Sequence, residues 1–484
     1  QLDEPVEKVD IRLLWPKDKP LYVRSLRGAV DAKVMETDAS KVYHWEFPAR
    51  LPYIEPDRTP GWFTARPEIE VTEFASWHDY ARWEMQHYNT QGQLNEAVKA
   101  IAAEIAAKST TPEEKMLHAL HYVQQKAVYG ESAYYVLPRT PAQTLARGFG
   151  DCKDKTFLLL ALLEALGIKA HAVAANVEGL HRLEASLPMP WHFNHVLAYV
   201  ELEGTSYWLD STQPPTATLS ELESGDKGDV LILAENTHAP MTMPLPLPDA
   251  PLHAKWEVYD ATKGFEQPVK LEVKEIFTGA AARYFRARLA AVGIQEIAQQ
   301  RLAEYAARYE GAMRDGAPFL QDSLGRNSVT MIDRYLIPAP MEANATKPKP
   351  FYLHHAELNG GLQRPEAQQR QVPYAVYYPY YRQHRVQLAL PEGYTAADRF
   401  AEEAKMVEHP AFHAEYRQYK KAGQWVMTSE VKFLQASVKA EAFEAFQQAA
   451  QEWDQATPAT TIVPTSNSVE GGVNWWAKGW VGFL

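Results

Sequence analysis

The feature that most constrains the fold is an uninterrupted apolar run at positions 157–163, directly after a glycine-containing turn. A helix over this run would be apolar on nearly all sides, so we expect it to be buried at the centre of a folded core. Gly167 follows the run and suits the left-handed conformation that often ends a helix. A strand-like segment at 170–175 comes next. The chain therefore predicts a central helix followed by sheet.

The single cysteine of the 484-residue chain, Cys152, stands at the predicted start of this helix. The first N–H groups of a helix lack internal partners, and the helix dipole favours negative charge there, so a thiolate is stabilised at this position. Most lone cysteines are small buried apolar residues. The neighbouring Asp151, Lys153 and Asp154 are charged, however, which is unusual around a core cysteine. By position alone, Cys152 is either a nucleophile or a buried structural cysteine.

A predicted β-hairpin supplies partners for this cysteine. Two strand-like segments are separated by Glu203 and Gly204, a pair that suits a two-residue turn. With that turn, His195 and Asp210 occupy diagonal positions on one face of the hairpin, whereas a turn one residue longer would place them on opposite faces. Cys152, His195 and Asp210 would then form a nucleophile, a base and an orienting carboxylate.

Three motifs in the right order give the chain a resemblance to a known family. They are Gly-Asp-Cys-Lys-Asp-Lys at 150–155, Phe-Asn-His-Val at 193–196 and Trp-Leu-Asp-Ser-Thr at 208–212. Residues 140–214 resemble the transglutaminase-like superfamily, a branch of the papain-like cysteine enzymes, and most closely its bacterial subgroup. The resemblance implies that Cys152, His195 and Asp210 are the catalytic residues.

The expected fold class is α+β, with a papain-like transglutaminase core between two β-rich domains. The expected domains are an N-terminal β-rich domain at 1–92, the core at 93–240, a C-terminal β-rich domain with helices at 241–470, and an aromatic tail at 471–484. The first domain is shorter than usual in the subgroup and starts at Gln1, so we expect processing, trimming or a naturally short domain. The tail contains three tryptophans, and we expect it to dock on the protein itself or on a partner.

Patterns in the C-terminal half predict further elements. Strands are expected at 269–277 and 283–289, a helix at 294–308, and a last helix near 441–453. Five tyrosines between 374 and 381 are read either as sheet-packing residues or as an aromatic platform for sugars or peptides.

Other residues are candidates for the cleft around the nucleophile. The backbone N–H of Cys152 would be one oxyanion donor, because it lies at a helix start. The candidates for the second donor and for the cleft walls are Gln143, Tyr129, Asn194, Trp208 and His192. His192, His195 and Cys152 offer no fourth ligand at a recognisable spacing, so we expect neither a metal nor a cofactor.

The expected chemistry is acyl transfer on peptide or isopeptide amides through a thioester, and the resemblance favours hydrolysis over transamidation. The alternative is a non-catalytic peptide- or glycan-binding scaffold with the same fold. The formal charge of −12 argues against a nucleic-acid partner, and no apolar run is long enough for a membrane span. The resemblance implies a protein or peptide substrate as the partner. The resemblance and the missing initiator methionine suggest a periplasmic or secreted protein, although one cysteine leaves the compartment open.

Overall fold

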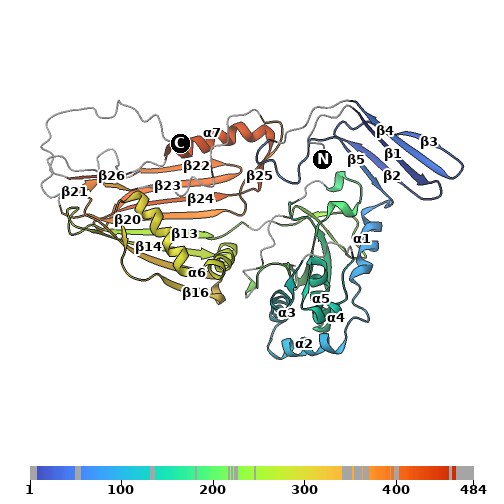
Figure 1. Ribbon diagram of the computed structural model, residues 1–484, viewed down its shortest axis with the longest axis horizontal. Coiled ribbons are helices and arrows are strands. Elements are labelled where there is room, and N and C mark those ends of the chain that lie inside the picture. Colours follow the sequence, from blue (N-terminus) through green and yellow to red (C-terminus); the bar gives the residue numbers. More distant parts are fainter. Residues whose placement is uncertain are drawn as a thin grey trace.

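The protein is described by a computed structural model, which combines helices and sheets in three regions along the chain (Figure 1). The described residues are 8–48, 56–130, 137–179, 183–215, 218–219, 222, 227–244, 247–340, 351–353, 362, 370–392, 394–396, 403–456 and 460–464. The predicted aromatic tail at 471–484 lies outside them. Among the described residues, no helix is both long enough and apolar enough to cross a membrane.

The N-terminal region is made of short strands. One antiparallel sheet has the order β1-β4-β3, and β2 pairs with β5 in a separate two-stranded sheet. The bounds are β1 Val9–Pro16, β2 Tyr22–Leu26, β3 Lys33–Glu36, β4 Ser40–Phe47 and β5 Glu68–Thr72.

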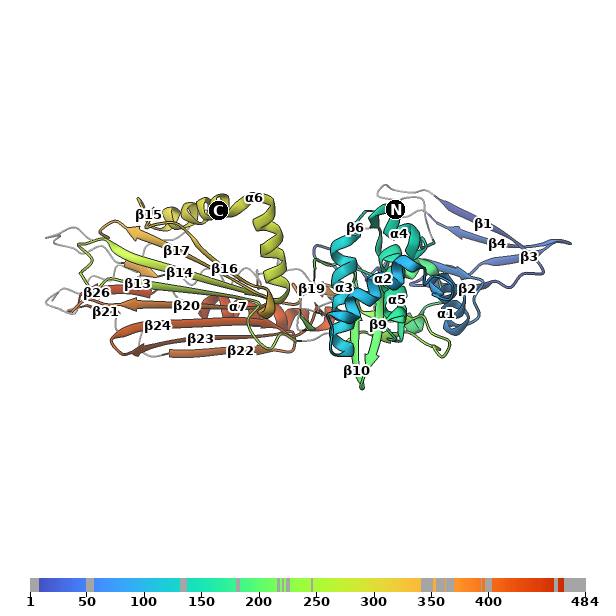
Figure 2. The ribbon, with the colours of Figure 1, turned by 90° about the horizontal axis from the view of Figure 1, so that it is seen from below.

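The middle region places five helices beside a five-stranded antiparallel sheet of order β10-β9-β8-β11-β12 (Figure 2). Its helices are α1 Trp77–Met85, α2 Glu96–Ala107, α3 Pro112–Lys126, α4 Pro141–Arg147 and α5 Cys152–Ala165, with 3-10 turns at Gln86–Tyr88, Leu183–Ala185 and Pro190–His192. Its strands are β8 Ala170–Ala175, β9 His195–Leu202, β10 Thr205–Leu209, β11 Asp229–Ile232 and β12 Met241–Thr242. A short parallel pair joins β6 Val128–Tyr129 to β7 Phe149–Gly150.

The predicted central helix is α5, and it is buried as expected. Leu158 to Leu163 are each at most 5% exposed, in one cluster with apolar residues of α2, α3 and the sheet. Burying a leucine side chain contributes about 1.5–3 kcal/mol, so this helix organises the core of the region. Gly167 ends it with a φ of 75°. Because α5 is apolar on nearly all sides and not on one face only, the hydrophobic effect places it at the centre of the core.

Residues before the predicted core boundary share this core. Trp77, Tyr80 and Tyr88 lie in the same apolar cluster as Phe157 of α5. We therefore propose that the core begins near Trp77 rather than at position 93, with the N-terminal strands ending at β5.

The C-terminal region is built on a nine-stranded sheet of order β15-β17-β14-β13-β20-β24-β23-β22, with β16 added on β17. All its pairs are antiparallel except β13 with β20. The strands are β13 His253–Asp260, β14 Val269–Thr278, β15 Met313–Arg314, β16 Phe319–Ser323, β17 Ser328–Ile337, β20 Tyr381–Ala389, β22 Glu403–His409, β23 Phe412–Lys421 and β24 Gln424–Phe433. Smaller sheets join β18 Phe351–Leu353 and β21 Tyr394–Ala396 to β26 Thr460–Pro464, and β19 Tyr374–Ala375 to β25 Ser437–Val438.

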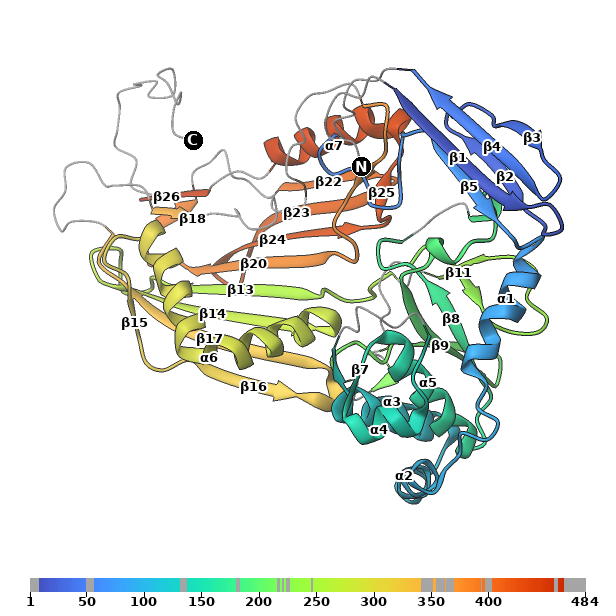
Figure 3. The same cartoon turned by 45° about the vertical axis from the view of Figure 1, so that its right-hand side comes forward.

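Two helices accompany this sheet, α6 Gly279–Arg308 and α7 Phe443–Ala456, with 3-10 turns at Leu324–Arg326 and Ala440–Ala442 (Figure 3). The strand predicted at 283–289 is wrong, because these residues form the first half of α6. Alanine, arginine and leucine dominate this stretch and favour a helix. Gly293 breaks α6 with a φ of 80°, and the predicted helix at 294–308 is its second half.

Candidate active site

Cys152 is the first residue of α5 and is held there by a tight local structure. Asp151 caps the helix by accepting a hydrogen bond from the backbone N–H of Asp154. A Cβ on Gly150 would lie 2.7 Å from the Cβ of Asp154, so only glycine fits at this position. The thiol is half-buried. The turn therefore presents Cys152 at the N-terminus of a helix, where negative charge is favoured.

The charged residues after Cys152 are buried and bonded to the protein. The carboxylate of Asp154 accepts hydrogen bonds from Arg139, at 2.7 Å from its backbone nitrogen and 2.6 Å from its guanidinium. The Lys155 ammonium donates to the carbonyl of Ala127 at 2.7 Å, and burial lowers the pKa of Lys155 to about 8. These bonds fix the start of α5 against the segments before α4 and after α3.

The hairpin of β9 and β10 has the predicted register. Leu202 pairs with Thr205, and Leu209 pairs with Ala198 at the other end. The positive φ angles of Glu203 and Gly204, 49° and 81°, fit the two-residue turn that these strands need. The hydroxyl of Thr156 in α5 donates to the carbonyl of Val196, at 3.1 Å. The start of β9 is thereby tied to the first turn of the cysteine helix.

His195 and Asp210 meet at the open end of this hairpin. The His195 Nε2 lies 2.9 Å from Oδ2 of Asp210, and the two residues are 7% and 4% exposed. Oδ1 of the same carboxylate accepts two hydrogen bonds from Thr212, from its backbone N–H at 3.0 Å and its hydroxyl at 2.6 Å. Gln213 donates to Oδ2 at 3.4 Å, and Gln124 donates to the backbone carbonyl of Asp210 at 3.1 Å. Asp210 is therefore fixed in position.

The electrostatics favour an ionised pair. Burial alone would lower the pKa of His195, but hydrogen bonds to Asp210 and Cys152 outweigh burial and raise it to about 9. Burial likewise disfavours the charged Asp210, yet bonds from His195 and Thr212 hold the pKa of this carboxyl well below its usual range. The site can thus hold an imidazolium next to a carboxylate near neutral pH.

The two nitrogens of His195 have different neighbours. Asp210 takes Nε2, and the thiol of Cys152 lies close enough to affect the pKa of the imidazole. Because Nε2 is engaged by the carboxylate, Nδ1 is the nitrogen left to exchange a proton with sulfur. The three residues are therefore arranged in the order that general-base activation of a thiol requires.

The remaining predicted cleft residues have separate places. Gln143 lies in the capping box of α4, where its side chain accepts from the backbone of Thr140. Tyr129 pairs with Gly150 in the strand pair just before Cys152. Further along, the Asn194 side chain accepts from Val177, His192 hydrogen-bonds the carbonyl of Leu187, and Trp208 contacts the ring of Tyr199.

Three contributors were not recognised in the sequence. Thr212 donates hydrogen bonds to the Asp210 carboxylate from both its backbone N–H and its hydroxyl, and Gln124 donates to the Asp210 carbonyl. Lys155 anchors α5 through its hydrogen bond to a backbone carbonyl. The aspartate and the threonine two residues later are the signature of a local side-chain turn, so Thr212 could have been predicted. Gln124 is 86 positions from its partner and carries no such signal.

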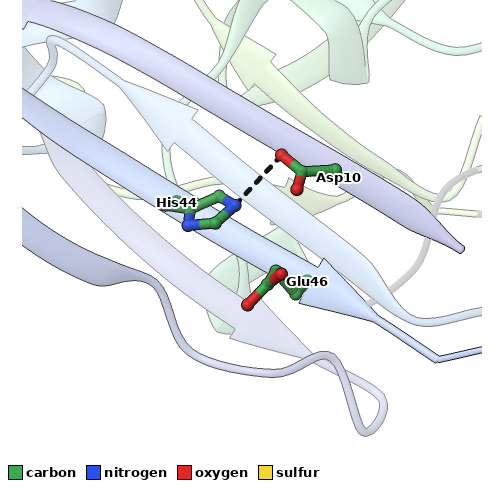
Figure 4. Close-up of side chains that lie close together, drawn as sticks. All are labelled: Asp10, His44 and Glu46. Carbon is green, nitrogen blue, oxygen red and sulfur yellow. Dashed lines mark hydrogen bonds and ion pairs between the residues drawn. The ribbon is translucent and has the colours of Figure 1, made fainter.

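Two side-chain groups elsewhere in the described residues have the composition of a metal site. One is Asp10, His44 and Glu46 on the N-terminal sheet (Figure 4), where His44 hydrogen-bonds Asp10 at 3.0 Å. Lys8 and Lys33 neutralise Glu46, which marks this group as an ion-pair network. The other is His413, Glu415 and Glu430 on the C-terminal sheet. Neither group contains a residue of the predicted triad.

Comparisons with known proteins concern the fold and the family of the region that holds this site. Residues 99–210 match the family model described as the transglutaminase-like superfamily. A sequence comparison with curated proteins finds no match. A solved "putative protease" from Parabacteroides distasonis ATCC 8503 aligns with a TM-score of 0.60 and 12% identity, over 95% of this chain and 74% of that one. This likeness shows a shared fold.

A "putative cysteine protease" from Cytophaga hutchinsonii aligns with a TM-score of 0.21 and 10% identity, over 44% of this chain and 73% of that one, which is too weak to carry an argument. The family match covers the helix that begins at Cys152 and both strands of the hairpin. Residues 99–210 of this chain therefore form a domain of the transglutaminase-like superfamily.

Proposed function

We propose that the protein is a cysteine-dependent acyltransferase that acts on peptide or isopeptide amides through a thioester. The observation that carries the proposal is the buried 2.9 Å hydrogen bond between His195 and Asp210 beside the only cysteine of the chain. In this proposal Cys152 is the nucleophile, His195 is the general base and acid, and Asp210 orients the imidazole.

The first half-reaction forms the acyl-enzyme. His195 takes the thiol proton at Nδ1, and the sulfur of Cys152 bonds to the amide carbon while the carbonyl π electrons move to oxygen. The backbone N–H of Cys152 is directed at this oxyanion, since it is one of the unpartnered donors at the start of α5. We propose Tyr129, which flanks the cysteine turn, as the source of the second donor. The C–N bond then breaks, and Nδ1 returns the proton to the leaving amine.

The second half-reaction releases the acyl group. Nδ1 takes a proton from water or from an acceptor amine, whose oxygen or nitrogen bonds to the thioester carbon. The C–S bond breaks, and the proton on Nδ1 restores the thiol. We propose hydrolysis as the main outcome, because the resemblance favours a bacterial peptide or isopeptide hydrolase slightly over a cross-linking transglutaminase. The fold neighbour from Parabacteroides is named a "putative protease", which makes peptides the first substrates to test.

The test is to detect the acyl-enzyme itself. Wild-type protein and the Cys152→Ser variant are incubated with peptide libraries, with and without glycine ethyl ester as acceptor, and analysed by intact mass. We expect an acyl adduct on Cys152 and free-acid products, and no adduct on the serine variant, because its alcohol is a far weaker nucleophile. Products that carry the ester would indicate transamidation.

The result that would contradict the proposal is also clear. If no library yields an adduct, and iodoacetamide labels Cys152 at pH 6 no faster than a model peptide thiol, the protein is a scaffold with the fold of an enzyme. The Cys152→Ser variant must keep the wild-type melting curve for the comparison to hold.

A further inference from the structure

A pocket of about 410 Å³ lies between the middle region and the C-terminal sheet. Gln213 and Lys227 line it from the middle region, and the start of β20 lines it from the other side. Gln213 also donates to the carboxylate of Asp210, at 3.4 Å. The pocket therefore begins one side chain away from the proposed triad. A larger cavity, about 690 Å³, opens beside Gly167 at the opposite end of α5 from Cys152.

The charges around the pocket are all of one sign. Lys227, Arg283 and Arg382 line it, and no aspartate or glutamate is among the described lining residues. The whole chain has a formal net charge of −12, so a cationic pocket is not a consequence of overall composition. Walls that carry one sign of charge attract ligands of the other sign. The pocket is suited to an anion.

Lys227 is the central observation. The residue is only 7% exposed, and its ammonium has no hydrogen bond or ion pair within the described part of the chain. The ammonium is not among the fully enclosed polar atoms that lack a partner there, so the buried part of Lys227 is its aliphatic stem. Lys155, by contrast, donates to a backbone carbonyl. The Lys227 ammonium can therefore bind an anionic ligand in the pocket.

Tyrosines form the opposite wall and are held in place. Tyr377 and Tyr380 line the pocket, and the guanidinium of Arg58 lies 4.4 Å from the ring centre of Tyr377. Arg58 also donates to the hydroxyl of Tyr374 at 3.0 Å, and its carbonyl accepts from the backbone of Ala375 at 2.7 Å. The segment between β4 and β5 thus fixes the tyrosine segment. Such rings offer apolar contact area and hydroxyl donors together.

We propose that this pocket is a substrate subsite that binds a carboxylate of the peptide on which Cys152 acts. The proposal rests on the function proposed above and extends it to a class of substrate. Lys227 forms the ion pair with the carboxylate, and the tyrosine rings contact the apolar part of the same residue. The carboxylate belongs either to an acidic side chain or to the end of the peptide chain.

Binding can be measured without turnover. The probes are three fluorescein-labelled hexapeptides of one sequence: one amidated with a central glutamate, one amidated with a central glutamine, and the glutamine peptide with a free terminal carboxylate. Fluorescence polarisation is recorded with the Cys152→Ala variant of the full chain. We expect at least one carboxylate peptide to bind about tenfold tighter than the amidated glutamine peptide, because hydrogen bonds to charged groups are the stronger kind. The tighter of the two identifies the source of the carboxylate.

Second-site variants in the Cys152→Ala background locate the ion pair. Lys227→Met should abolish the preference and Lys227→Arg should keep it. Lys263→Met, which removes an exposed lysine in the turn after β13, should leave the preference unchanged. Equal binding of all three peptides, no binding of any of them, or a preference that survives Lys227→Met in a folded protein would overturn the subsite.

Failure of the subsite and failure of the proposed function give different results. If the wild-type protein forms the acyl-enzyme but its Cys152→Ala variant shows no carboxylate preference, the proposed function stands and the subsite is refuted. If a carboxylate preference depends on Lys227 but the wild-type protein forms no acyl-enzyme, the binding pocket stands and the catalytic role is refuted.

Discussion

Replacing Asp210 with asparagine tests the triad through the direction of its hydrogen bonds. Oδ1 of Asp210 accepts from the Thr212 backbone N–H at 3.0 Å, and Oδ2 accepts from His195 at 2.9 Å. Asparagine keeps only one oxygen. The backbone N–H of Thr212 cannot become an acceptor, whereas an imidazole can change tautomer. The new amide nitrogen should therefore face His195.

This orientation predicts the size of the defect. An NH₂ group donating to Nε2 leaves the proton of a neutral His195 on Nδ1, the nitrogen that must accept the proton of Cys152. A carboxylate-to-amide change that produced the wrong tautomer in a serine-protease triad lowered turnover by about ten-thousand-fold, or about 5 kcal/mol of barrier. Cysteine enzymes with an asparagine in this role exist, so the effect depends on Thr212, not on the amide itself.

The assay is the rate of Cys152 alkylation by iodoacetamide from pH 5 to 10, together with peptide turnover once a substrate is found. Asp210→Asn should label slowly at pH 6, while wild-type protein labels fast. Asp229→Asn is the matched control, since Asp229 also accepts a backbone N–H and a threonine hydroxyl, at 2.8 Å and 2.7 Å, away from the triad. Turnover within tenfold of wild type in a folded Asp210→Asn protein would refute the reasoning.

Three further predictions concern pH and stability. Burial lowers the pKa of His195, but bonds to Asp210 and Cys152 raise it from 6.5 to about 9. The raised pKa of His195 stabilises the folded protein fully below about pH 6.5, and this stabilisation is lost as the pH rises towards 9. The wild-type free energy of unfolding, measured with urea, should therefore exceed that of His195→Gln by about 3 kcal/mol less at pH 9 than at pH 6.5. Gly150→Ala should lower the melting temperature and slow Cys152 labelling, since its Cβ would lie 2.7 Å from the Cβ of Asp154, a crowding that costs about 1–3 kcal/mol. Deleting residues 471–484 should lower the melting temperature or cause aggregation in light scattering, because their tryptophans are expected to dock; an unchanged curve would favour a partner instead.

The parts predicted well from sequence are governed by neighbours along the chain. An apolar run is buried in the folded protein whatever its neighbours are, and the apolar run of α5 is buried in the core of the middle region. A two-residue turn at Glu203 and Gly204 fixes the pairing of the residues on either side, and the observed register follows from it. Because the side-chain period of a strand is two, this register alone places His195 and Asp210 on one face.

The parts predicted poorly depend on distant residues. The stretch at 283–289 contains the adjacent aromatic residues Tyr284 and Phe285, which favour a strand, but it forms a helix whose Phe285 is buried against distant residues such as Val329 and Met331. The tyrosines near 377 allowed two interpretations, and the structure places Tyr377 and Tyr380 in the lining of one pocket with Lys227. Lys227 itself carries no local signal, because nothing in its neighbours along the chain predicts that it lines a pocket.

The charged residues around Cys152 have a structural role that the sequence did not indicate. Asp151, Lys153 and Asp154 favoured a nucleophile because charged residues are rare around a core cysteine. In the structure Asp154 and the following Lys155 are almost fully buried, at 0% and 2% exposed, and each is bonded to a segment outside α5. Their function is therefore to hold the helix, not to solvate the thiol. A proton transfer between Cys152 and His195 needs the two side chains fixed to within a fraction of an ångström, and rigid elements achieve this better than loops. The charged motif supplies that rigidity on the cysteine side, as Thr212 and Gln124 do on the side of Asp210.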